Sequence, residues 1–171
     1  KVFGKEDIIP LWVADMDFAS PPQVTRALIK RARHPAYGYT LTSRRYYDAV
    51  RQWLVRRFRW EVPEDDILTT PGIVTALALC VEAFTAAGDE VIIQPPVYPP
   101  FFSVVTQAGR RLLLNPLHRT DGTYHMDLDD LRTKISPRTK LLLLCSPHNP
   151  VGRVWTKQEL HALGELCEQH G

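Results

Sequence analysis

The chain has 171 residues, of which 44% are hydrophobic and 23% are charged, and its formal net charge at pH 7 is +2. This composition is typical of a soluble globular protein and excludes a fibrous or disordered chain. So small a net charge does not indicate a nucleic-acid partner. No apolar stretch is long enough to predict a membrane span or the core of a signal peptide.

The cysteines and histidines predict neither a disulfide framework nor a metal site. The three cysteines, Cys80, Cys145 and Cys167, form no C-x-x-C pair, so we expect reduced thiols and a cytoplasmic protein. The histidines have no spacing that would bring two of them onto one helical face. Because the chain begins with Lys1 rather than Met, we expect it to be part of a longer protein.

The first third of the chain predicts two helices separated by proline. Ser20 can cap a helix whose first turn accepts Pro21 and Pro22, and Pro35 ends that helix. A second helix is predicted over residues 43–58. Its apolar side chains recur at helical spacing and are expected to pack in a core: Tyr46, Val50, Trp53, Leu54 and Phe58.

From residue 66 onward, predicted strands alternate with predicted helices. An apolar helix over residues 73–87 is expected to be buried on all sides and to end at Gly88. A turn is expected at Asp121-Gly122, and Asp127 opens a short helix. The remaining predicted elements are strands over residues 90–94, 111–114 and 139–145, a helix over 101–108, and a final helix opened by the capping box of Thr156 and Glu159.

This order predicts an α/β fold in which a mainly parallel sheet is covered by helices on both faces. Residues 61–171 are expected to form the first part of a large domain. Residues 1–60 are expected to form an arm and helices that belong to a smaller lobe or pack on a neighbouring subunit.

The loop after the last predicted strand carries the most informative candidate residue, Asn149. Pro147 and Pro150 lie on either side of it, and proline fixes φ and removes a backbone donor, so the loop is rigid. In an open α/β sheet, ligands bind beyond the carboxyl ends of the strands. A single amide on a rigid loop there predicts recognition of a planar polar ligand.

Two other segments carry candidate ligand groups. Gly72 precedes the predicted helix over residues 73–87, where free N–H groups and the helix dipole favour an anion such as phosphate; an ordinary turn is the alternative. Tyr98 lies among prolines just after the strand over residues 90–94 and suits stacking on a planar ring; a core tyrosine is the alternative.

Other polar residues are less specific. Asp15 and Asp17 lie two residues apart, either as an acid/base pair or as helix caps. Tyr37 and Tyr39 flank Gly38, and a packing role fits them at least as well as binding. No G-x-S-x-G, Walker or G-x-G-x-x-G motif occurs, so hydrolase, nucleotidase and dinucleotide-binding functions lose their main support.

Five segments taken in order resemble the pyridoxal-phosphate (PLP) class I/II aminotransferase family, of fold type I. They are L-W-V-A-D-M-D-F at 11–18, Y-G-Y at 37–39, P-G-I-V at 71–74, P-P-V-Y at 95–98 and S-P-H-N-P-V-G at 146–152. The first and last segments are the most specific, and they are most similar to the cystathionine β-lyase-like C–S lyase branch of the MalY/PatB type. The resemblance covers the whole chain but only the first part of the family's sequence. It implies an incomplete aspartate aminotransferase-like fold.

The resemblance implies cofactor-binding roles for residues that match the family's motifs. Asn149 would bind the 3-oxygen of the PLP ring, and Tyr98 would stack on the ring. The N–H groups of Ile73 and Val74, after Gly72, would bind the phosphate.

The resemblance also implies a homodimer, in which Tyr39 would reach the phosphate of the partner subunit's cofactor. Ala14 would lie near the substrate carboxylate. The family's Schiff-base lysine, and the residues that bind the pyridine nitrogen and the substrate carboxylate, correspond to sequence beyond Gly171. Neither Lys140 nor Lys157 is a credible substitute, so no catalytic residue is assigned and the chain alone is expected to be inactive.

The implied function is that of a PLP-dependent β-lyase. It would release thiol, pyruvate and ammonia from a small-molecule substrate, cystathionine or another S-substituted cysteine. One alternative is an amino-acid aminotransferase, which would share nearly all of these residues. Another is a non-catalytic PLP-fold module that binds an amino acid or a partner.

Overall fold

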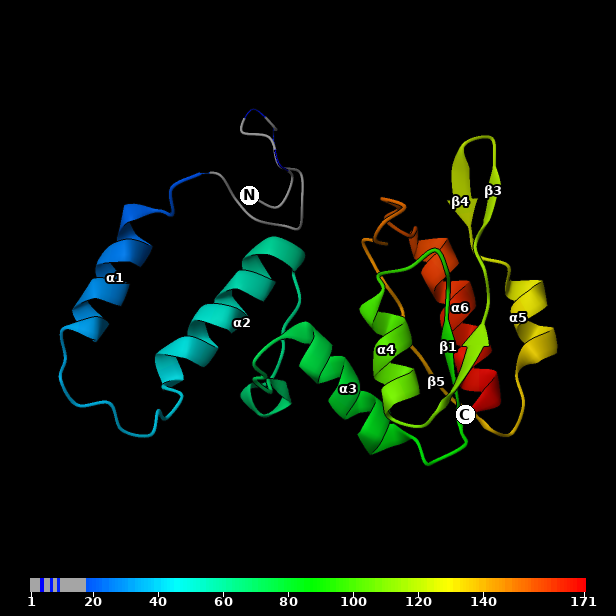
Figure 1. Ribbon diagram of the computed structural model, residues 1–171, viewed down its shortest axis with the longest axis horizontal. Coiled ribbons are helices and arrows are strands. Elements are labelled where there is room, and N and C mark those ends of the chain that lie inside the picture. Colours follow the sequence, from blue (N-terminus) through cyan, green and yellow to red (C-terminus); the bar gives the residue numbers. More distant parts are fainter. Residues whose placement is uncertain (1–3, 5–6, 8, 10–17) are drawn as a thin grey trace. The chain divides into compact units, whose positions relative to one another are not determined.

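The structure, a computed structural model, describes residues 4, 7, 9 and 18–171 (Figure 1). The chain divides into two compact units, residues 1–66 and residues 67–171. No helix among the described residues has both the length and the apolar character needed to cross a membrane.

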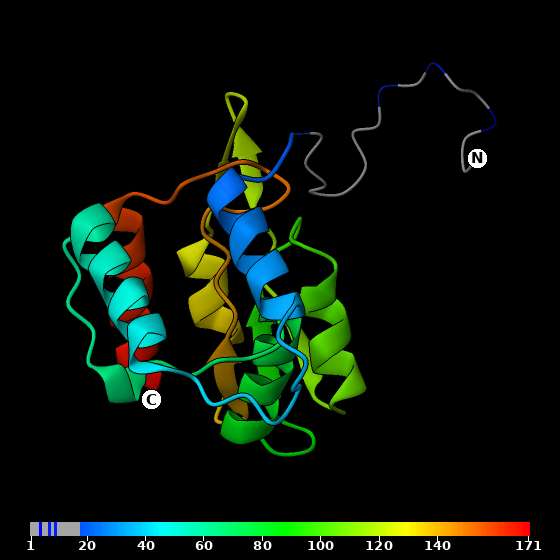
Figure 2. The same ribbon diagram turned by 90° about the vertical axis from the view of Figure 1, so that its left-hand side faces the viewer.

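The first unit contains the helices α1 (Pro22–Ala32) and α2 (Arg44–Phe58) and the short 3-10 helix η1 (Glu64–Asp66). Figure 2 shows α1 and α2 as separate helices joined by an irregular segment. Helix α2 begins after Ser43, as predicted. Helix α1 differs from its prediction because Pro21, not Ser20, is the N-cap, and no side chain caps the helix. With Pro22 as the first helical residue, Ser20 lies one position too early to serve as the cap.

The apolar stripe of α2 is not packed in a core, contrary to the sequence prediction. No residue of α2 is buried, and Trp53 and Phe58 are 55% and 62% exposed. Helical spacing identifies a face that is suited to packing, but it does not specify the surface that covers this face. Within the first unit, no described residues bury it.

The second unit is built on a parallel three-stranded sheet in the order β2–β1–β5. The central strand β1 (Glu90–Ile93) pairs with β2 (Arg111–Leu114) on one side and with β5 (Thr139–Leu142) on the other. In this register Val91 lies opposite both Leu112 and Leu141.

Helices cover both faces of this sheet, as predicted. Alternate residues of a strand point to opposite faces, and β1 follows this rule. Val91 and Ile93 pack with α3 (Ile73–Phe84) and α4 (Pro100–Gln107), whereas Ile92 packs with α5 (Leu128–Lys134) and α6 (Lys157–His170). The unit is therefore a three-layered α/β structure with one apolar core on each side of the sheet.

Helix α3 is less buried than predicted. It ends at Phe84, and Val81 is its one buried residue, while Leu79 and Phe84 are 55% and 67% exposed. One side of α3 covers the sheet, and nothing among the described residues buries the opposite side. Gly88, with φ of 84°, is not the cap of this helix; it turns the chain before β1.

Capping residues mark the starts of α5 and α6, as predicted. The Asp127 side chain accepts a hydrogen bond from the Asp130 N–H at 2.9 Å. At α6, the Glu159 N–H donates to Thr156 Oγ1 at 3.2 Å, and the Thr156 N–H donates to Glu159 Oε2 at 2.7 Å. These two bonds form the predicted capping box.

The antiparallel hairpin of β3 (His118–Thr120) and β4 (Thr123–His125) was predicted only as a turn at Asp121-Gly122. Figures 1 and 2 show it projecting from the rest of the second unit. The last strand, β5, is shorter than the predicted 139–145 and ends at Leu142. The Leu143 N–H still donates to the Ile92 carbonyl at 3.0 Å before the chain leaves the sheet.

Candidate functional site

The predicted ligand-binding loops leave the sheet at one edge. Because β1 and β5 are parallel neighbours, their carboxyl ends lie together, and the loops over residues 94–99 and 143–156 begin there. Helix α3 leads through a short turn into the amino end of β1. In Figure 1, α3 lies obliquely beside α4, with its C-terminus toward the turn that leads into β1.

The loop that carries Asn149 is closed by its own backbone. The His148 N–H donates to the Arg153 carbonyl at 2.7 Å, and the Gly152 N–H donates to the His148 carbonyl at 2.7 Å. The Asn149 N–H donates to Cys145 Sγ at 3.4 Å. Asn149 is exposed, and its side-chain amide forms no hydrogen bond with another described residue, so both its donor and its acceptor are free for a ligand.

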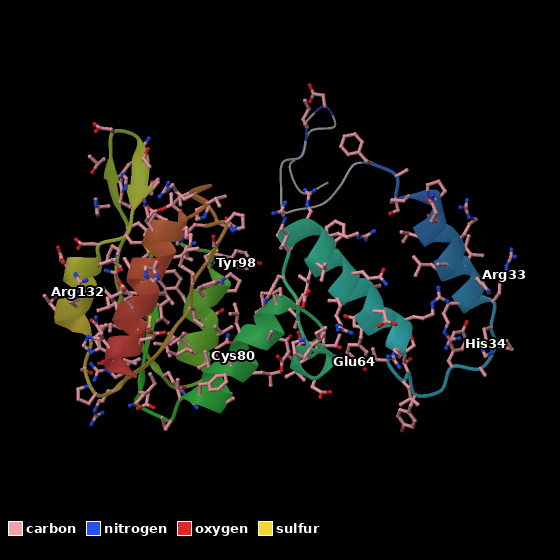
Figure 3. The ribbon with its side chains drawn as sticks, turned by 180° about the vertical axis from the view of Figure 1, so that it is seen from behind. Arg33, His34, Glu64, Cys80, Tyr98 and Arg132 are labelled. Atoms are coloured by element: carbon pink, nitrogen blue, oxygen red, sulfur yellow. The ribbon has the colours of Figure 1, made fainter. Side chains whose placement is uncertain are left out.

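Tyr98 is presented by a loop that is anchored on each side. The Phe101 N–H donates to the Tyr98 carbonyl at 3.0 Å, and the Leu117 N–H donates to the Pro95 carbonyl at 2.7 Å. Phe101 and Val97 are each 6% exposed in the core, whereas Tyr98 is 39% exposed. Figure 3 shows Tyr98 where α4 begins. The ring is therefore not a core side chain, and part of its surface is open to a ligand.

The N-terminus of α3 offers unpaired backbone donors. Its first helical hydrogen bond runs from the Ala76 N–H to the Gly72 carbonyl at 3.0 Å. The N–H groups of Ile73, Val74 and Thr75 thus have no acceptor in the described part of the chain. A Cβ atom at Gly72 would meet no atom within 4 Å. Exposed N–H groups at a helix start favour an anion.

A hydrogen bond from His148 joins the two loops. His148 Nε2 lies 3.0 Å from the Pro96 carbonyl oxygen. The ring packs edge-to-face against Trp155, with ring centroids 5.4 Å apart, and Trp155 Nε1 donates to the Cys145 carbonyl at 2.9 Å. Burial lowers the pKa of His148 below its ordinary value, so the imidazole is neutral at pH 7.

Buried amides support the loop that carries Tyr98. Gln94, the residue after β1, donates through Nε2 to Asn115 Oδ1 at 3.0 Å, and both side chains are at most 1% exposed. Asn115 Nδ2 donates to the Asp127 carbonyl at 2.8 Å and to Asp130 Oδ2 at 3.0 Å. Hydrogen bonds from Lys134 and from Asn115 lower the pKa of Asp130. These bonds connect β1, β2 and α5 beneath the loop.

The other predicted site residues belong to the first unit or lie outside the described residues. Tyr39 belongs to the first unit and is fully exposed. Tyr37, also in that unit, is 69% exposed, donates from its hydroxyl to the Ala32 carbonyl and lies under the Arg31 guanidinium. The predicted substrate contact Ala14 and the carboxylate pair of Asp15 and Asp17 lie outside the described residues.

Sequence reasoning missed the contributions of His148, Gln94 and Asn115. The sequence analysis considered His148 only as a metal ligand. Its contact with Pro96 was missed because the two residues lie 52 positions apart in the sequence. Gln94 and Asn115 each follow a strand directly, and that position was the one available signal.

His118 and His125 do come together, as a stacked pair across the hairpin with centroids 5.6 Å apart. No group of three or more candidate metal ligands forms among the residues that the structure describes.

The second unit has the architecture of α/β proteins that bind ligands at the carboxyl ends of parallel strands. The chain belongs to the family of class I and II aminotransferases, whose family pattern matches residues 6–171. This membership confirms the family resemblance inferred from the sequence motifs.

Among curated proteins, the chain is similar to cystathionine β-lyase PatB of Bacillus subtilis (strain 168). The two are 48% identical over 172 residues, which cover 100% of this chain and 44% of PatB. The chain thus spans less than half the length of this relative.

Solved structures of the same fold agree. A PLP-bound putative aminotransferase of Clostridium difficile 630 superposes with a TM-score of 0.91 at 43% identity, over 98% of this chain and 43% of that one. A PLP-bound C–S lyase of Staphylococcus hominis has a TM-score of 0.87 at 33% identity, over 93% of this chain and 41% of that one. The predicted PLP-dependent transferase fold, present here in part, is confirmed.

Proposed function

We propose that the protein carrying this chain is a PLP-dependent C–S β-lyase that acts on cystathionine or another S-substituted cysteine. The observation that carries the proposal is that Tyr98 and Asn149 lie on loops that follow two neighbouring strands and are joined by the bond from His148 to Pro96. Similarity to a protein named cystathionine β-lyase and to a PLP-bound C–S lyase supports it.

The groups at the sheet edge fit PLP. The cofactor has a planar ring, a negatively charged 3-oxygen and a phosphate. We propose that Tyr98 stacks on the ring, that the Asn149 amide donates to the 3-oxygen, and that the Ile73 and Val74 N–H groups, after Gly72, bind the phosphate. Each of these groups has an exposed surface or an unused donor among the described residues.

This fit assigns separate roles to the cofactor and to the residues that hold it. PLP, when bound, withdraws electrons as bonds at the substrate Cα break. The Tyr98 and Asn149 loops orient the ring, and the start of α3 neutralises the phosphate charge. Lys140 lies near the amino end of β5 and Lys157 opens α6, so neither lies on the loops that carry Tyr98 and Asn149. As the family resemblance implies, we propose that the catalytic lysine is supplied by sequence after Gly171.

The predicted roles of the first unit belong to the same proposal. We propose that residues 1–60 form an arm and a dimer contact, that residues 61–171 form the first part of the PLP-binding domain, and that the protein is a cytoplasmic homodimer. Tyr39 would bind the phosphate of the partner's cofactor, and Ala14 would approach the substrate carboxylate. The exposure of Tyr39 and of the α2 stripe is consistent with a surface that contacts a partner subunit.

An assay on the full-length protein with PLP and L-cystathionine tests the function. A lyase produces one pyruvate for each thiol released. Pyruvate is measured by coupled oxidation of NADH, and thiol is measured with a thiol reagent. The second candidate is an aminotransferase, because the Clostridium difficile relative is described as one. Amino-group exchange with a 2-oxo acid, without thiol release, would reject the lyase in favour of that candidate.

A further inference from the structure

The imidazole of His148 occupies the contact between the two proposed cofactor loops. Its Nε2 atom lies 3.0 Å from the Pro96 carbonyl oxygen, two residues before Tyr98, and its own backbone directly precedes Asn149. The residue is 1% exposed, and its ring meets Trp155 at an interplanar angle of 89°. The ring therefore has one defined position.

The geometry also defines which nitrogen carries the proton. A carbonyl oxygen only accepts hydrogen bonds, so Nε2 must donate. Since burial lowers the pKa of His148, the ring is neutral at pH 7 and Nδ1 is unprotonated. Nδ1 is buried and has no hydrogen-bond partner among the described residues. His148 therefore serves as a donor to the other loop.

Each loop is internally fixed and begins at the end of one of two paired strands, and the bond from His148 to Pro96 adds a direct link between the loops. The Asn149 loop is closed by the two bonds between His148 and residues 152–153. The Tyr98 loop is held by the Phe101 and Leu117 N–H groups. The Nε2–H bond of His148 to the Pro96 carbonyl joins the two loops.

We propose that His148 is a positioning residue: its Nε2–H bond to the Pro96 carbonyl sets the placement of the Asn149 amide relative to the Tyr98 ring, and hence the orientation of PLP. This inference rests on the proposed function. A planar ligand that accepts a hydrogen bond from Asn149 at its edge and stacks on the Tyr98 ring requires a fixed distance and orientation between these two side chains. Displacement of a binding group by about 1 Å costs on the order of 100-fold in rate.

The test compares two substitutions in the full-length protein. His148→Leu fills similar space and removes the donor. His148→Gln retains a side-chain N–H that reaches a similar position. We expect His148→Leu to weaken PLP binding at least tenfold and to reduce the circular dichroism of the bound cofactor, and His148→Gln to restore most of both. His161→Leu is the matched control, because that side chain is exposed and its ion pair among the described residues is with Glu165 of the same helix; its PLP binding should equal that of the wild type.

An NMR measurement keeps the inference testable if His148→Leu fails to fold. In protein labelled with ¹⁵N-histidine, the His148 ring should be neutral with its proton on Nε2. A proton on Nδ1, or a charged ring at pH 7, would overturn the inference.

The outcomes separate this inference from the proposed function. If wild-type protein binds no PLP, the proposed function fails. If the wild type binds PLP and His148→Leu binds it with the same affinity and the same dichroism, the proposed function stands and the positioning role is rejected. Failure of His148→Gln to rescue a folded His148→Leu phenotype would also reject it.

Discussion

Asn149 is an exposed side chain on a closed loop, so its replacement should affect ligand binding more than folding. Asn149→Ala leaves no buried group unpaired, and we expect the free energy of unfolding to change by less than about 0.5 kcal/mol. Loss of a hydrogen bond to a charged oxygen should weaken PLP binding about tenfold or more. Titration of the full-length protein with PLP measures this. Gln158→Ala, an exposed amide on α6, is the control; equal affinity in the two variants would contradict the assigned role of Asn149.

His148 should make stability depend on pH. Its pKa in the folded protein is depressed below the ordinary 6.5, so the unfolded chain binds a proton at higher pH than the folded protein does. The contribution of the neutral ring is therefore complete above about pH 6.5 and declines as the pH falls toward the folded pKa. Between pH 7.5 and 5, urea unfolding should show the wild type losing more stability than His148→Gln. Parallel pH profiles for the two proteins would be inconsistent with this depression.

Single residues differ in how far the sequence predicts them. The prolines around Asn149 and Tyr98 are local, and local stiffness predicted two presented side chains that the structure indeed exposes. The partner of His148 could not be predicted, because it depends on how β1 and β5 pair. The buried bond between Gln94 and Asn115 likewise depends on the pairing of β1 with β2.

At the scale of elements, the capping box of α6 provides a direct test of local stabilisation. Thr156→Ala removes the acceptor for the Glu159 N–H and should lower the free energy of unfolding by about 1 kcal/mol. Urea denaturation measures the change, with Lys157→Ala as the control at the next, exposed position. A loss no larger than that of the control would mean that the cap contributes nothing measurable.

Asn115 forms hydrogen bonds that connect three elements, and Asn115→Ala should lower the free energy of unfolding more than Thr156→Ala does. Asn115→Ala leaves the buried Gln94 Nε2 and the Asp130 carboxylate without this partner. An unsatisfied buried polar group costs about 1–3 kcal/mol, so we expect a loss on the order of 2 kcal/mol in urea unfolding. Gln107→Ala, an exposed change on α4, should be nearly neutral. Equal stabilities of these two variants would show that the buried amides do not anchor the Tyr98 loop.

Elements with strong local signals were predicted well, and short or unpartnered ones were not. Asp127 and Thr156 marked the starts of α5 and α6 because caps act within one turn. The β3–β4 hairpin was missed because three-residue strands are too short to show an alternating pattern. The stripes of α2 and α3 were expected to be buried, yet periodicity does not reveal whether a covering surface is present.

For the molecule as a whole, we propose that this chain carries the cofactor-binding residues and that the reactive lysine lies in other sequence. The isolated 171-residue chain should therefore form no specific borohydride-reducible adduct with PLP. Lys134 forms an ion pair with Asp130, Lys140 lies within β5, and Lys157 is the first residue of α6. Mass spectrometry after reduction measures this. Stoichiometric labelling of one lysine would contradict the assignment.

The most direct test of the cradle is a crystal structure of the full-length protein with PLP. We predict the Asn149 side-chain nitrogen within hydrogen-bond distance of the cofactor 3-oxygen, the Tyr98 ring stacked on the pyridine face, and the phosphate at the Ile73 and Val74 N–H groups. A cofactor bound elsewhere, or bound at this edge without contact to Asn149 and Tyr98, would contradict the account.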